Sequence, residues 1–175
     1  YYPQHFNRGD TSENMYFKHL LHSCDKHNLS YLVFEEPDYN SSALRDKNSI
    51  PFDFIYILIL ILRRFFSEKK SYILIDQSIG KLISNIFFRK IRFSNFITLS
   101  QSMLSFFRGV NQEARLYDLQ HGILYNDKKN YIYHGVPDAN LSQNNVNLLL
   151  TGESYKNILI SNERNRFFHS NSHVI

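Results

Sequence analysis

Apolar residues recur along the chain in two alternating patterns, one typical of helices and one typical of strands. Apolar side chains three or four residues apart, and long apolar runs, predict helices. Short runs of β-branched and aromatic residues predict strands. Helices are expected over residues 11–27, 52–66, 78–90, 100–112 and 152–160, and strands over residues 1–6, 30–34, 71–75, 95–99, 115–119 and 146–150.

Strands alternate with helices along most of the chain, which favours βαβ units and a parallel sheet. One segment, residues 71–75, fits a strand but could also extend a helix. The pattern predicts an α/β fold with a Rossmann-like parallel sheet and helices on both of its faces. Ligands of such sheets bind beyond the carboxyl ends of the strands, so polar residues there are the first candidates for function.

The length of 175 residues favours one domain, which we expect over residues 1–161. Residues 162–175 are polar and lack an apolar period, so they are expected to form a frayed tail or a linker toward a missing second domain. The chain opens on Tyr1-Tyr2-Pro3 with no initiator methionine, which also indicates a fragment.

Composition excludes several classes of protein. With 43% hydrophobic and 15% aromatic residues, the chain can build a core and is not disordered throughout. Its single cysteine, Cys24, excludes intramolecular disulfides and multi-cysteine zinc sites, and fits a reducing cytoplasm. The net charge of +4 suits phosphorylated ligands or anionic lipid headgroups, although ordinary solvated faces explain it equally well. We expect no nucleic-acid partner, because the chain has neither a basic recognition helix nor an RNP-like aromatic pattern.

The longest apolar run covers residues 54–62 and is too short to span a membrane, which takes about 20 residues. Arg63 and Arg64 follow it directly. The segment is therefore either a buried core helix or a helix with one side on an anionic membrane surface. Apolar residues on all sides favour the buried helix.

The most informative segment is Asp118-Leu119-Gln120-His121-Gly122, at the end of a predicted strand. An imidazole at the carboxyl end of a strand can bind or protonate a ligand, and Gly122 would let a ligand approach the backbone. The alternative is a histidine bonded to a backbone carbonyl in a structural turn.

These five residues are similar to the E-L-Q-H-G signature of GT-B glycosyltransferases that make bacterial capsules and lipopolysaccharide O-antigens. The later segment 148–155, with Gly152, Glu153 and Tyr155, resembles the strand and G-E-x-Y pattern that precede the hinge in that family. Asp118 stands where the family more often has glutamate, which leaves a catalytic role for this carboxylate open.

The resemblance implies a two-domain enzyme at the inner face of the bacterial plasma membrane. This chain would be the N-terminal half, which mainly holds the glycan acceptor, and the missing half would hold the nucleotide sugar. No cofactor or metal is implied beyond that co-substrate. Two alternatives stay open: a transferase of glycerol-phosphate type, and a non-catalytic membrane-surface or interaction domain.

Further candidates lie outside the motif. Glu35 or Glu36 could enter the cleft as the general base that deprotonates an acceptor hydroxyl, or both could be solvated loop carboxylates. We expect His121 to lie beside one of them. His134 and the tyrosines of its loop, together with Gln120, Gly122 and Glu153, are candidate contacts for substrate. The loop Arg8-Gly9-Asp10, before a predicted helix, is a candidate contact for phosphate or sugar hydroxyls.

Overall fold

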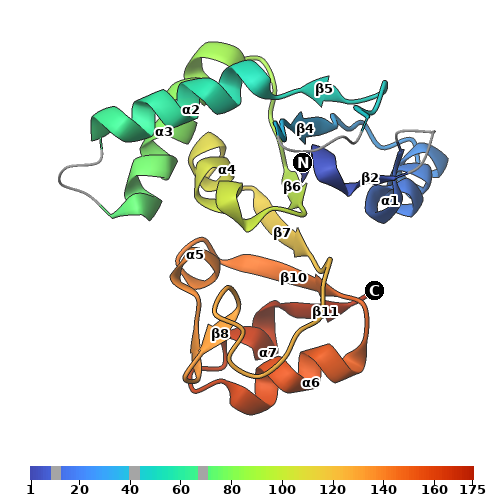
Figure 1. The fold of residues 1–175 in the computed structure, drawn as a ribbon, viewed down its shortest axis with the longest axis vertical. Coiled ribbons are helices and arrows are strands. Elements are labelled where there is room, and N and C mark those ends of the chain that lie inside the picture. The colour runs from blue at the N-terminus through green and yellow to red at the C-terminus, as the bar shows by residue number, and fades with distance from the viewer. Residues whose placement is uncertain (9–12, 40–43, 67–70) are drawn as a thin grey trace. The chain divides into compact units, whose positions relative to one another are not determined.

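The computed structural model describes residues 1–8, 13–39, 44–66 and 71–175 (Figure 1). The chain divides into two compact units, Tyr1–Ile61 (unit 1) and Leu62–Ile175 (unit 2). Each unit is described by itself below.

Unit 1 contains a three-stranded parallel sheet of order β1-β4-β5. Its strands are β1 (Tyr2–Pro3), β4 (Phe34–Glu36) and β5 (Ile50–Pro51), and the 3-10 helix η1 (Gln4–Phe6) follows β1. Strands β2 (Asn7–Arg8) and β3 (Glu13–Asn14) form an antiparallel pair that leads into helix α1 (Met15–Lys26). The aromatic core of this unit includes Tyr2, Phe17 and Phe52.

Two predicted boundaries in unit 1 are wrong. Helix α1 begins at Met15, and its N-cap is Asn14, whose side-chain oxygen accepts from the backbone N–H groups of Tyr16 and Phe17. The predicted strand at residues 30–34 lies further along the chain, as β4. The position of β4 is set by its backbone pairing with β1, which local strand propensity cannot predict.

Helices α2 (Asp53–Phe66) and α3 (Tyr72–Phe87) carry most of the apolar residues in the middle of the chain. The prediction of α2 is confirmed. Of the two alternatives for residues 71–75, the helix is confirmed and the strand is wrong, because Ser71 is the N-cap of α3 and residues 72–75 are its first turn. Ile75, Ile79 and Ile83 are buried at four-residue spacing on one face of α3, so packing of that face outweighs the β-propensity of the segment.

The burial predicted for α2 is also wrong. Ile59 is buried, but Phe54 is 67% and Phe65 is 77% exposed. At 100° per residue, six of the seven exposed side chains form one stripe along the helix, and the seventh, Phe66 at its end, lies off it. Only one side of this all-apolar helix is covered, and the stripe, called here the α2 face, consists of Phe54, Ile57, Leu60, Ile61, Arg64 and Phe65.

Unit 2 is built on a four-stranded parallel sheet of order β11-β10-β7-β6. Its strands are β6 (Asn95–Thr98), β7 (Arg115–Leu119), β10 (Val146–Leu150) and β11 (Ser172–Val174). Three of them were expected at these places, and the prediction of an α/β fold with a parallel sheet flanked by helices is confirmed. Between the strands lie η2 (Gln101–Met103), α4 (Leu104–Val110), the antiparallel pair β8 (Ile132–Tyr133) and β9 (Val136–Pro137), and helices α5 (Ala139–Ser142), α6 (Glu153–Asn162) and α7 (Phe167–Asn171).

Helices α3 and α4 cross in close contact through two glycines. A Cβ atom at Gly80 would lie 2.1 Å from the carbonyl oxygen of Phe106, and one at Gly109 would lie 2.0 Å from that of Gln77. Neither position has room for a side chain, so this contact fixes α3 on the part of unit 2 that follows β6.

The segment 162–175 is not frayed but packs on the sheet of unit 2, and its role as a linker toward a second domain stays a prediction. It contains α7 and β11, and β11 pairs in parallel with β10. Phe168 is fully buried, which accounts for the order of this polar segment. Hydrophobic periodicity did not predict α7 and β11, because a helix of five residues and a strand of three are too short to show a repeat.

Candidate functional site

The carboxyl ends of β6, β7 and β10 meet at one edge of the parallel sheet of unit 2. Side chains alternate along β7, so Leu116 and Asp118 point to one face and Tyr117 to the other. Leu116 and Asp118 are both buried. A carboxylate therefore occupies a position that a hydrophobic residue would normally fill.

Asp118 has two hydrogen-bond donors, both to Oδ2. The side-chain amide of Gln101 donates at 2.8 Å and the hydroxyl of Tyr131 donates at 3.2 Å. The other oxygen, Oδ1, is buried without a partner. Burial raises the pKa of Asp118 to about 6, against the lowering effect of the two donors and of the positive charge of Lys128. This carboxyl group can thus gain or lose a proton near neutral pH.

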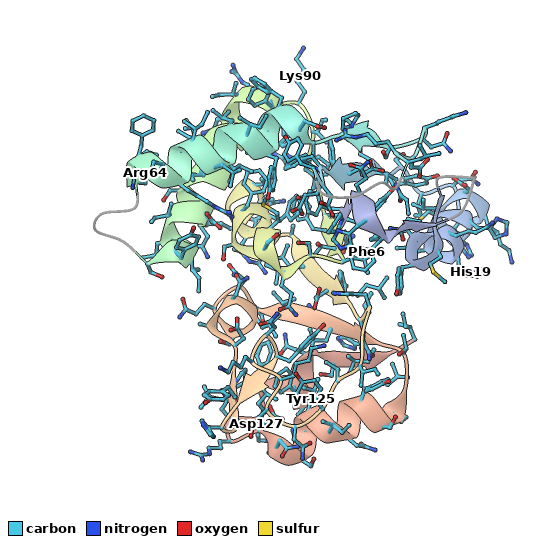
Figure 2. The ribbon with its side chains drawn as sticks, viewed as in Figure 1. Phe6, His19, Arg64, Lys90, Tyr125 and Asp127 are labelled. Carbon is cyan, nitrogen blue, oxygen red and sulfur yellow. The ribbon has the colours of Figure 1, made fainter. Side chains whose placement is uncertain are left out.

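The segment from Gly122 to Pro137 forms a cationic and aromatic loop after the motif. Lys128 Nζ donates to the carbonyl of Ile123 and lies 5.9 Å and 5.4 Å from the ring centres of Tyr125 and Tyr131. Tyr125 is exposed, and Figure 2 labels it together with Asp127 on this loop. The loop therefore combines the positive charge of Lys128 with an accessible aromatic ring, which suits an anionic group next to a sugar or base ring.

The motif residues after β7 have different surroundings. Gln120 is buried, and its side-chain oxygen accepts from the backbone and hydroxyl of Thr151. Gln120 thereby links the ends of β7 and β10. His121 is half-buried, with Nδ1 3.4 Å from the carbonyl oxygen of Leu119. That contact is the one expected of a structural turn, although it is long for a hydrogen bond.

The space around Gly122 would accommodate a side chain. A Cβ atom there would meet only Lys128 Nζ, at 3.7 Å. The surface above Gly122 is consequently open, as close approach by a ligand requires.

His134 and Glu153 are both exposed residues of unit 2. His134 has a positive φ of 49°, stacks on Tyr133, and its backbone N–H donates to Asp127. Glu153 occupies the first turn of α6, just after β10. Glu153 thus lies at the same sheet edge as the motif, whereas His134 lies in the turn between β8 and β9.

Glu35 and Glu36 belong to unit 1. Glu35 is fully buried, and its Oε2 accepts from Tyr2, Asn7, Ser49 and the backbone of Asp46. Glu36 is half-buried and accepts from the hydroxyl of Tyr1 at 2.6 Å. Neither is a solvated loop carboxylate. Because His121 belongs to unit 2, a site shared with either glutamate stays a prediction.

The remaining candidates are in the loop before α1. Gly9 and Asp10 lie outside the described residues. Arg8 lies in β2, where its backbone pairs with Glu13.

The sequence did not predict the two side chains that donate hydrogen bonds to Asp118. Tyr131 was expected only as a ring for stacking on sugar, and Gln101 was not considered. Both are far from Asp118 along the chain, by 13 and 17 residues. No local pattern points to such partners, but a carboxylate in a buried strand is itself a signal that donors must be sought elsewhere.

Among the described residues, no group of three or more His, Cys, Asp or Glu side chains is placed to hold a metal ion. Within the same residues, no helix combines the length and apolar character needed to cross a bilayer. No protein-family model matches the chain, and no curated protein or solved structure does either.

Proposed function

We propose that the chain is one half of a GT-B-type glycosyltransferase, which transfers a sugar from a nucleotide-sugar donor to a cell-surface polysaccharide or a lipid-linked acceptor. One observation carries the proposal: a buried carboxyl group, that of Asp118, lies three residues before His121 at the carboxyl edge of a parallel sheet. The similarity of residues 118–122 to the family signature supports the same assignment.

The chemistry needs a proton acceptor and a counter-charge. As the acceptor hydroxyl forms the new bond to the anomeric carbon, its proton must leave, and the bond from that carbon to the donor phosphate breaks. In this proposal His121 either takes the proton or donates a hydrogen bond to the phosphate. Lys128 balances the negative charge that builds up on the leaving group. Gln120 holds the strand end in place.

The test is activity of the full-length protein with CMP-, UDP-, GDP- and CDP-linked sugars and a lipid-linked glycan acceptor. Release of nucleotide that depends on the acceptor, together with a lengthened glycan, is the expected result. Transfer from CDP-glycerol but from no nucleotide sugar would favour the glycerol-phosphate alternative. Absence of transfer from every donor by a folded full-length protein would overturn the proposal.

A second candidate function is a membrane-surface domain, and the α2 face favours it. Five exposed apolar side chains and Arg64 lie on one side of a helix of 14 residues. Arg63 is not available to a membrane in the same way, because its guanidinium binds the carboxylate of Asp76 and the carbonyl of Ser102. Arg64 is exposed on the α2 face, and it is the charge to test against anionic lipid.

Flotation with vesicles tests the membrane candidate. A membrane role predicts binding to vesicles with anionic lipid, weakened by salt and abolished by the double change Phe54→Ser and Phe65→Ser. Leu29→Ser is the matched control, since Leu29 is 59% exposed but lies outside α2. Equal flotation of all three proteins, or none, would remove this candidate.

A further inference from the structure

A short segment of unit 2, residues 86–92, covers the end of α3 and the turn after it, and is exposed over almost all of its length. Single exposed apolar residues are common on protein surfaces, but this segment combines several of them with positive charges. Figure 2 labels Lys90, whose side chain points away from the ribbon. Six of its seven residues are exposed and are called here the 86–92 surface: the cations Arg89, Lys90 and Arg92, and the apolar residues Ile86, Phe87 and Ile91.

The seventh residue, Phe88, anchors the segment to the core. Phe88 is buried, its ring centre lies 5.5 Å from that of Phe93, and Phe93 in turn lies 5.2 Å from Phe96 in β6. The backbone N–H of Ile91 donates to the carbonyl of Phe88 at 2.9 Å, and the side-chain amide of Asn111 donates to the carbonyl of Phe93 at 2.7 Å. These contacts hold the exposed side chains in place. A surface that is ordered in advance loses little conformational entropy when it binds a partner.

The positive charges of this surface are not balanced by carboxylates nearby in the sequence. The chain has neither aspartate nor glutamate from residue 77 to residue 112. Within the part of the chain that the structure describes, no ion pair involves Arg89, Lys90 or Arg92. The three charges are therefore available to an anionic partner.

We propose that the 86–92 surface docks unit 2 on an anionic lipid surface. The three cations lie against the phosphates of the headgroups, while Ile86, Phe87 and Ile91 enter the boundary between headgroups and acyl chains. A nucleic acid or another acidic polymer would meet the cations but would leave the apolar side chains in water. A lipid surface places hydrocarbon next to negative charge and so matches both halves of the surface.

The 86–92 surface shares no residue with the α2 face or with the site at the end of β7. The inference stands on unit 2 alone and does not depend on the transfer reaction, so the two can fail separately. A lipid-linked acceptor would lie in the same lipid surface, which makes the two proposals compatible.

The test is flotation of the 175-residue chain with two kinds of vesicle, one of phosphatidylcholine alone and one of phosphatidylcholine and phosphatidylglycerol in equal amounts. The expected result is binding to the mixed vesicles that salt weakens, with little binding to the neutral vesicles. Equal binding to both kinds of vesicle, or binding to neither, would overturn the proposal.

Neutralising the three cations together tests the charged half of the surface. Binding to the mixed vesicles should weaken about 100-fold, because each cation near an anionic surface contributes roughly fivefold. The changes are Arg89→Gln, Lys90→Gln and Arg92→Gln. The matched control removes the same charge from three exposed cations elsewhere in unit 2, by Lys129→Gln, Arg164→Gln and Arg166→Gln, and should retain most of the binding. Equal weakening by the two triple changes would assign the effect to net charge and overturn the surface.

The double change Ile86→Ser and Ile91→Ser tests the apolar half. Binding should weaken at least about tenfold, because two side chains no longer enter the acyl boundary. Ile123→Ser with Val136→Ser is the matched control, since both residues are exposed in unit 2 but lie outside the segment. Wild-type binding by the Ile86→Ser, Ile91→Ser protein would indicate a purely electrostatic partner and would overturn the lipid surface.

The two membrane candidates are also separable. If Phe54→Ser with Phe65→Ser abolished flotation while the triple change of the 86–92 cations left it intact, the α2 face would be the membrane contact and this proposal would be wrong. All these changes are at exposed side chains, so the Tm of each variant should stay close to that of the wild type.

Discussion

Each unit of the molecule buries one carboxylate in a parallel strand, and the two are held differently. Glu35 in β4 receives four donors on Oε2, and Arg45 lies 3.8 Å from its other oxygen. Asp118 in β7 receives two donors, and no ion pair joins it among the described residues. Both side chains are less than 2% exposed. Burial alone, therefore, does not decide what a carboxylate does.

The difference lies in what each carboxylate holds together. The donors to Glu35 come from β1, β2 and the segment before β5, so the carboxylate ties these parts of unit 1 to one another. The donors to Asp118 are one amide and one hydroxyl, and in each carboxylate one oxygen, Glu35 Oε1 or Asp118 Oδ1, has no hydrogen-bond partner. A charge that is so little compensated favours its protonated form. Glu35 thus ties parts of unit 1 together, whereas burial of Asp118 raises its pKa.

The largest effect is expected at the strand end next to Asp118. In the full-length protein, His121→Ala should reduce kcat/KM about 100- to 10,000-fold, as loss of a positioned acid–base group does. The loss of stability should stay below about 1 kcal/mol, because the side chain is only half-buried. Turnover and Tm are to be measured on one preparation. A well-folded variant with near-normal turnover would assign His121 to the structural turn.

The next effect concerns Glu35. Glu35→Ala should lower the free energy of unfolding of unit 1 by about 2–4 kcal/mol, because four donors and Arg45 lose their acceptor in a buried place. Glu35→Gln keeps one oxygen and should cost less. Urea unfolding followed by amide hydrogen exchange in α1 reports on this unit. A loss below 1 kcal/mol in Glu35→Ala would show that Glu35 is not the residue that ties unit 1 together.

The pH dependence of stability distinguishes Asp118. Its pKa is about 6 in the folded protein, above the ordinary value of 3.8, so its contribution to stability is fully present below about pH 4 and is lost as the pH rises through 6. At about 1.4 kcal/mol per pKa unit, the loss is at most about 3 kcal/mol. Asp118→Asn should remove it.

The measurement is the free energy of unfolding by urea from pH 4 to pH 7. The difference between wild type and Asp118→Asn isolates this group from the others that titrate in the range. Parallel pH profiles of the two proteins would mean that Asp118 has an ordinary pKa, and the contrast with Glu35 would disappear.

The same comparison shows which features of the structure can be predicted from the sequence. It reached β7 and β10 because both are short segments rich in apolar residues, and α2 because its apolar run is long. It did not reach the exposure of the α2 face, because apolar residues occupy every side of the helix over residues 54–62 and the neighbours that cover one side are set by tertiary packing. Nor did it reach the partners of Glu35, which lie 11 to 33 residues away. Such long-range contacts are set by tertiary packing and cannot be predicted from the local sequence pattern.

The smallest effects come from two tyrosines that occupy equivalent roles. The hydroxyl of Tyr131 lies 3.2 Å from Asp118, and that of Tyr2 lies 3.3 Å from Glu35. Tyr131→Phe removes one of two donors, so the pKa of Asp118 should rise further, because that hydrogen bond lowers it. Tyr2→Phe removes one of four donors and should cost about 0.5–1.5 kcal/mol of stability.

A carbon-13 NMR titration of the Asp118 carboxyl group measures the first effect. Tyr117→Phe is the matched control, since Tyr117 neighbours Asp118 in β7 but points to the other face. The midpoint should move to higher pH in Tyr131→Phe and stay in place in Tyr117→Phe. If Tyr131→Phe left the midpoint unchanged, the Tyr131 hydroxyl would not be a donor to this carboxylate. Gln101 would then be the side chain that stabilises its charge, and Gln101→Leu should produce the rise instead.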